Sequence, residues 1–189
     1  GTTGEAPEAI VLVESCEQAR TVSPPQRERL AYLTQTTLSV DETAEIVEIL
    51  RRRFRHLEAP KKEDICYATT NRQRAVKRLF GAVEVLLVIG SRNSSNSNRL
   101  RETGAQHGLL AYLIQDETEL DPGWFEGVAT VGVTAGASTP EVLVQRVLSR
   151  LTQWGVAATR ELTGVRETTS FRLPRPLVLE HARRMKNEP

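Results

Sequence analysis

Residues 83–99 read VEVLLVIGSRNSSNSNR, which places an apolar run directly before a glycine and a polar loop. The apolar run at residues 83–89 predicts a buried strand, and residues 98–106 have the pattern of a helix. The first N–H groups of a helix have no internal partner, and the helix dipole adds partial positive charge there. Small serine and asparagine side chains can donate further hydrogen bonds to phosphate oxygens. This order predicts an anion site, although a solvated loop explains a single stretch of this kind equally well.

The same order of apolar strand, polar loop and helix recurs along the chain. Strands are predicted at residues 9–14, 30–35, 64–68, 83–89, 109–114, 129–133 and 170–173. Helices are predicted at residues 15–21, after Ser39, from Thr70 to about Phe80, at residues 98–106 and at residues 140–154. Ser39 and Glu42 have capping-box spacing, as do Thr70 and Gln73, and Thr139 is expected to cap the last helix.

Alternating short strands and helices are typical of parallel sheets covered by helices. The sequence therefore predicts an α/β fold of two similar units, each with a short parallel sheet, followed by a C-terminal tail. Residues 59–63 read APKKE and indicate a linker. We expect the first unit at residues 1–63, the second at residues 64–155 and the tail at residues 156–189.

The composition narrows the function classes. The chain has 189 residues, a net charge of +1 and 5% aromatic residues, so that neither nucleic acid nor an anionic membrane is a favoured partner. No apolar run approaches the ~20 residues of a membrane span. Two cysteines are too few for a disulfide framework and favour a reducing compartment. Neither a Walker-type phosphate loop nor a GxGxxG motif occurs.

Polar residues follow four of the predicted strands. The segments are residues 35–37, 66–71, 91–98 and 134–138, all rich in Ser, Thr, Asn or Gly, and the second of them begins with Cys66. Because ligands of open parallel sheets bind beyond the carboxyl ends of the strands, we expect these segments to converge. They predict a small phosphate-bearing ligand held by small donors, with a thiolate near it.

The four segments together resemble the LytB-type 4-hydroxy-3-methylbut-2-enyl diphosphate reductases. The motifs that carry the resemblance are QTTLSVDET at 35–43, DICYATTNRQ at 64–73, GSRNSSNSNRL at 90–100 and VTAGASTP at 133–140. The resemblance implies a pseudo-symmetric fold of three α/β units, of which this chain has the second, the third and the tail. It also implies a [4Fe–4S] cluster held by three cysteines. Cys66 matches one ligand position, and the other two are expected upstream of Gly1.

The resemblance assigns roles to individual residues. Thr36 matches a catalytic position that orients the substrate hydroxyl or relays a proton. Thr69 lies next to the cluster in the family's substrate site, whereas Cys16 matches no required position. The diphosphate-binding positions are matched by Ser94, Ser95, Asn96 and Ser138.

The implied reaction is the reductive dehydration of 4-hydroxy-3-methylbut-2-enyl diphosphate to isopentenyl and dimethylallyl diphosphates, in the methylerythritol phosphate route to isoprenoids. The electron donor would be a ferredoxin or a flavodoxin, in a bacterial cytoplasm or a plastid stroma. With one cluster cysteine, the chain is expected to be inactive alone. Two alternatives are a non-catalytic phosphate-binding module derived from this family and an unrelated phosphosugar-binding enzyme.

Overall fold

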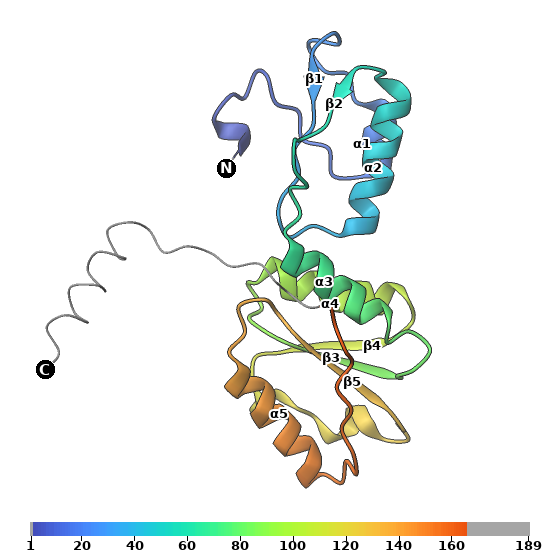
Figure 1. Cartoon of the computed structure of the whole chain (residues 1–189), viewed down its shortest axis with the longest axis vertical. Helices are drawn as coiled ribbons and strands as arrows, with labels where there is room; N and C mark the ends of the chain where they lie inside the picture. Colours follow the sequence, from blue (N-terminus) through green and yellow to red (C-terminus); the bar gives the residue numbers. More distant parts are fainter. Residues whose placement is uncertain (1, 166–189) are drawn as a thin grey trace, which may run out of the picture.

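The computed structural model describes residues 2–165 and shows two parallel sheets with helices packed beside them (Figure 1). The first part of the chain forms a short 3₁₀ helix η1 (Thr2–Gly4), then α1 (Cys16–Thr21), β1 (Leu30–Ala31), α2 (Val40–Arg53) and β2 (Leu57–Glu58). The rest forms α3 (Tyr67–Lys77), β3 (Val85–Ile89), α4 (Ser95–Gln106), β4 (Leu110–Ile114), η2 (Glu117–Glu119), η3 (Pro122–Phe125), β5 (Val131–Ala135) and α5 (Glu141–Gln153). The predicted α/β class, with short parallel sheets covered by helices, is confirmed.

The larger sheet has the strand order β4-β3-β5, and both pairs are parallel. The central strand β3 reads VLLVI and is buried along its whole length, because helices cover both of its faces. Leu86 and Val88 pack with Val76 of α3 and Leu100 of α4 on one face. On the other face, Leu87 belongs to a cluster with residues of α5. Figure 1 shows α3 and α4 on one side of this sheet and α5 on the other.

The smaller sheet pairs only two residues of β1 with two residues of β2. The predicted strand at residues 30–35 is therefore shorter than expected, and the predicted strand at residues 9–14 is wrong. A strand needs a neighbour for its backbone N–H and C=O groups, and no described strand pairs with residues 9–14. Two of their apolar side chains are exposed, Val11 by 47% and Leu12 by 64%.

Hydrogen bonds at the helix starts explain three further differences from the sequence predictions. Residues 64–68 do not form a strand, because Cys66 caps α3 and its sulfur accepts the backbone N–H of Thr69. Thr70 and Gln73 are therefore buried inside α3 instead of opening it. Thr139 does not cap α5, because its hydroxyl donates to the carbonyl of Ile89 at 2.9 Å. Ser39 does cap α2, as predicted.

Within residues 2–165, no helix combines the length and the apolar character that crossing a membrane requires. The strand predicted at residues 170–173 lies outside the described residues, as does most of the predicted tail. The division of the chain after residue 63 stays a prediction.

Candidate functional site

The carboxyl ends of the larger sheet converge on the first turn of α4. Beyond β3, the N–H of Gly90 donates to the carbonyl of Ile114 at 2.8 Å, and beyond β5 the N–H of Gly136 donates to Ile89 at 2.9 Å. A Cβ atom on either glycine would overlap the side chain of Ser97. Glycine is therefore required at both positions, so that two loops can close around one serine of α4.

The N-terminus of α4 presents the polar groups that the sequence predicted for an anion. Ser94 is the N-cap, and its hydroxyl accepts the backbone N–H of Ser97 at 3.3 Å. Ser95 is exposed in the first turn, and Ser138 is exposed in the loop that follows Gly136. The structure therefore brings the serine-rich start of α4 and the loop after β5 to one edge of the sheet.

Asn96 is the unusual member of this group. Its side chain is only 6% exposed, and neither its amide nitrogen nor its amide oxygen has a hydrogen-bond partner. Leaving a buried amide unpaired costs free energy, so that such groups in a folded protein call for an explanation. A bound polar ligand at the start of α4 would supply the missing partner.

Cys66 is held as a hydrogen-bond acceptor at the start of α3. Its sulfur lies 3.1 Å from the hydroxyl oxygen of Thr69 and accepts the backbone N–H of Thr69 at 3.4 Å. Burial raises the pKa of the Cys66 thiol, but these hydrogen bonds, the backbone N–H of Ala68 and the charge of Arg72 together lower the pKa below its ordinary value. The half-buried sulfur is therefore biased toward the thiolate, which is the form that binds metals.

Thr36, which belongs to the first part of the chain, lies next to Cys66. Its carbonyl accepts the backbone N–H of Cys66 at 3.1 Å, and its side chain is exposed. Arg72 then connects α3 with the larger sheet, because its Nε donates to the carbonyl of Ala135 at 3.2 Å and its Nη1 to Ala68 at 3.4 Å. A hydrogen-bonded path thus runs from Thr36 through Cys66 and α3 to the end of β5.

The Cys66 sulfur and the groups that donate hydrogen bonds to it fit one ligand position of an iron–sulfur cluster. Cluster ligands are thiolates, commonly with N–H···S hydrogen bonds that tune the potential; Cys66 has such a hydrogen bond, and the pKa of its thiol is lowered. Among the described residues, no group of three or more His, Cys, Asp or Glu side chains is placed to hold a metal ion. Cys16 lies on α1 with its sulfur 3.7 Å from a carboxylate oxygen of Glu45. Of the two cysteines, Cys66 is the one whose surroundings suit a metal ligand.

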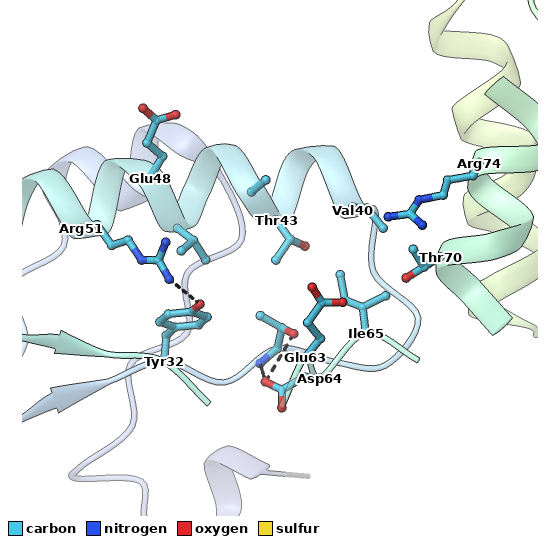
Figure 2. Close-up of a pocket in the computed structure, with 13 residues that line it drawn as sticks. Tyr32, Val40, Thr43, Glu48, Arg51, Glu63, Asp64, Ile65, Thr70 and Arg74 are labelled. Carbon is cyan, nitrogen blue, oxygen red and sulfur yellow. Dashed lines mark hydrogen bonds between the residues drawn. The ribbon is translucent and has the colours of Figure 1, made fainter. Parts of the chain in front are cut away.

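A separate cleft of about 330 Å³ lies between α2 and the chain that follows β1 and β2. Figure 2 shows Arg51 of α2 reaching the hydroxyl of Tyr32, and Arg74 of α3 pointing toward Val40. On the opposite wall, Asp64 accepts the backbone N–H of Thr34 at 2.7 Å. None of the predicted site residues lines this cleft.

The family model described as LytB protein matches residues 1–152. The chain belongs to the LytB family. Membership excludes an unrelated phosphosugar-binding enzyme as the alternative.

Two bacterial relatives named 4-hydroxy-3-methylbut-2-enyl diphosphate reductase show how far the similarity extends. The relative from Psychrobacter arcticus is 53% identical over 89% of this LytB chain, and the relative from Phenylobacterium zucineum is 56% identical over 94%. The chain spans only 53% and 57% of the lengths of these two relatives. The solved reductase from Plasmodium falciparum superposes with a TM-score of 0.88 at 33% identity, covering 98% of this chain and 59% of that structure.

Three tertiary contacts around the candidate site of the LytB chain are not predicted by the sequence. Ser97 closes the contact between Gly90 and Gly136, Arg72 joins α3 to β5, and Gln73 binds the backbone on either side of Ser39. A glycine directly after each strand could have indicated the close approach of two backbones. The local pattern around Gln73 indicated a capping box with Thr70 instead of this contact, and no local signal distinguishes Arg72 from other polar residues of a helix.

Proposed function

We propose that the natural protein carrying this chain reduces 4-hydroxy-3-methylbut-2-enyl diphosphate to isopentenyl and dimethylallyl diphosphates, in the methylerythritol phosphate route. The carrying observation is the identity of 53–56% to relatives named as this reductase, over about nine-tenths of the chain. The reaction consumes two electrons and two protons. The allylic C–O bond breaks, the oxygen leaves as water, and one proton ends on carbon.

In this proposal, the start of α4 and the loop after β5 bind the diphosphate. The free N–H groups and dipole of α4 attract the anion, and the unpartnered amide of Asn96 supports a ligand there. The hydroxyl groups of Ser94, Ser95 and Ser138 would donate hydrogen bonds to the diphosphate oxygens. Binding the non-reacting diphosphate fixes the position of the allylic carbon, which converts binding energy into correct orientation.

Cys66 would hold one corner of a [4Fe–4S] cluster whose remaining ligands come from outside this chain. When bound, the cluster would pass electrons from an external donor to the substrate and polarise the allylic oxygen. Thr69 would stabilise the Cys66 thiolate through the hydrogen bonds described above. Thr36, whose backbone binds the Cys66 N–H, would orient the substrate hydroxyl or pass it a proton.

The proposal extends to the surroundings of the reaction. A ferredoxin or flavodoxin would donate the electrons, and the bacterial cytoplasm or the plastid stroma would be the compartment. Both cysteines are free thiols, in agreement with a reducing environment. We further propose that residues 1–63 and 64–155 are the second and third units of the family's pseudo-symmetric fold.

The test is anaerobic turnover by the natural protein, purified with its iron and sulfide and supplied with a chemical reductant. Formation of both C5 diphosphates supports the proposal, and a protein that holds a cluster but gives no product refutes it. The isolated chain should bind pyrophosphate without turnover, because one thiolate does not retain a cubane cluster. A natural protein that also lacks iron would instead be a phosphate-binding module.

A further inference from the structure

Gln73 is a buried polar side chain that binds backbone groups on another element. It lies on α3, is 2% exposed, and uses both ends of its amide. Its Nε2 donates to the carbonyl of Leu38 at 2.8 Å, and its Oε1 accepts the N–H of Val40 at 3.0 Å. The two backbone groups lie on either side of Ser39, where the loop after Thr36 enters α2.

The loop of residues 36–40 is therefore hydrogen-bonded to α3 at two positions along the helix. At the start of the helix, the Cys66 N–H holds the carbonyl of Thr36 at 3.1 Å. Gln73 holds the other end of the loop about 10 Å further along the helix, as the rise of 1.5 Å per residue dictates. Together with the hydrogen bond from the Thr34 N–H to Asp64 at 2.7 Å, these two attachments fix where Thr36 lies relative to Cys66.

Among the described residues, the other side-chain contacts between α2 and the helices α3 and α4 lie at the surface: two ion pairs, and a hydrogen bond from Gln106 to Glu42 at 2.9 Å. Lys77 contacts Asp41 at 2.6 Å, and Arg99 lies 3.6 Å from Glu42. Exposed pairs of this kind are screened by water and salt and hold geometry weakly. Gln73 alone makes two uncharged hydrogen bonds in a buried setting, where hydrogen bonds are strong and a lost partner is expensive.

We propose that Gln73 is a positioning residue for the reaction: its amide fixes the loop that carries Thr36 next to the Cys66 thiolate. This inference rests on the proposed function, because the position of Thr36 relative to Cys66 affects catalysis only if the proposed reaction takes place there. Gln73 itself touches neither the substrate nor the cluster. It acts through the backbone of Leu38 and Val40.

The test replaces Gln73 by leucine in the natural protein. Leucine fills a similar volume but binds neither backbone group, so the loop is released while α3 remains helical. We expect kcat to fall by about 10- to 100-fold, which is the usual effect of a displacement near 1 Å in a reacting group. KM should stay within about twofold, because the diphosphate is bound by α4 and not by this loop. Iron content should be unchanged.

Amide hydrogen exchange supplies a readout that does not depend on activity. In the Gln73→Leu protein, the N–H of Val40 should exchange at least about tenfold faster, because its acceptor is gone. The amides of β3 should keep their protection. Lys77→Gln, one turn further along α3, removes only an exposed ion pair and should change neither kcat nor exchange at Val40.

Gln73→Glu is the conservative variant. The new carboxyl can bind both backbone groups only when it is protonated, because an ionised carboxylate faces the Leu38 carbonyl with no proton to donate. The ratio of its kcat to that of wild type, measured at the same pH, should therefore rise as the pH is lowered. This variant also serves if Gln73→Leu does not fold.

The outcomes separate the two proposals. An unchanged kcat in Gln73→Leu, despite faster exchange at Val40, overturns the positioning role. Loss of iron and a raised KM together with the loss of kcat also overturn it, because the effect would then be general disruption. If wild type itself lacks reductase activity, the proposed function fails, and unchanged Val40 exchange in Gln73→Leu would show that Gln73 does not fix the loop either.

Discussion

Replacing Asn96 by alanine should make the unliganded protein more stable and its binding of pyrophosphate weaker. Asn96 is 6% exposed, and both polar atoms of its amide lack a partner. An unsatisfied buried polar group costs about 1–3 kcal/mol. Lost packing of the amide offsets part of the gain, and we expect a net increase of about 1 kcal/mol in the free energy of unfolding. For a chain of this size, that corresponds to about 2–4 °C in Tm.

The effect on the ligand has the opposite sign. A hydrogen bond from Asn96 to a charged phosphate oxygen contributes about 1.5–3 kcal/mol. Its loss should raise the Kd for pyrophosphate by about 10- to 150-fold, at 1.4 kcal/mol for each factor of ten. Thermal unfolding at increasing pyrophosphate concentrations measures both quantities in one experiment, because a ligand that binds only the folded protein raises Tm with its concentration.

Asn93→Ala is the matched control, since Asn93 is exposed in the loop directly before α4 and its side chain has no described partner. We expect it to change stability by less than about 0.5 kcal/mol, as is usual for surface positions. The reasoning is refuted if Asn96→Ala lowers the Tm of the unliganded protein, or if it leaves the response to pyrophosphate unchanged.

Three further outcomes are expected. In a Cys16→Ser background without iron, alkylation of Cys66 should reach half its maximal rate at a lower pH than that of a free cysteine, because the pKa of the thiol is lowered in the fold. Thr69→Val should move this midpoint to higher pH, and an unmoved midpoint would show that the Thr69 hydroxyl does not stabilise the thiolate. Gly136→Ala should cost about 1–3 kcal/mol by overpacking against Ser97, and adding Ser97→Ala should restore most of the loss in urea unfolding; two additive losses would contradict the contact. Cys66→Ser in the natural protein should lose the iron–sulfur absorbance, and a spectrum equal to that of wild type would contradict the ligand assignment.

The sequence predicts those parts of the fold whose signals are local. The apolar run of β3 indicates a strand covered on both faces, and the serine before α2 indicates a helix start. Residues 9–14 carry the same apolar signal as β3 but form no strand, because a strand also depends on a neighbour that its own sequence does not specify. Cys66 was not predicted as a helix cap, since sulfur is an uncommon acceptor at that position.

For the site, the sequence predicts which loops meet but not how they are joined. The polar residues after the strands could be expected at one edge, because parallel strands present their carboxyl ends there. Ser97 lies between two glycines that are distant in the chain, and Gln73 binds a loop more than thirty residues before it. Such contacts follow from tertiary packing and leave no periodic pattern in the sequence.

A crystal structure of the natural protein with 4-hydroxy-3-methylbut-2-enyl diphosphate bound would locate the diphosphate relative to Cys66. We predict that diphosphate oxygens accept hydrogen bonds from the start of α4, from Asn96 and from Ser138, and that the allylic hydroxyl is directed toward Thr36 and the Cys66 sulfur. A diphosphate bound instead in the cleft beside α2 (Figure 2), or a Cys66 sulfur pointing away from the ligand, would contradict the account.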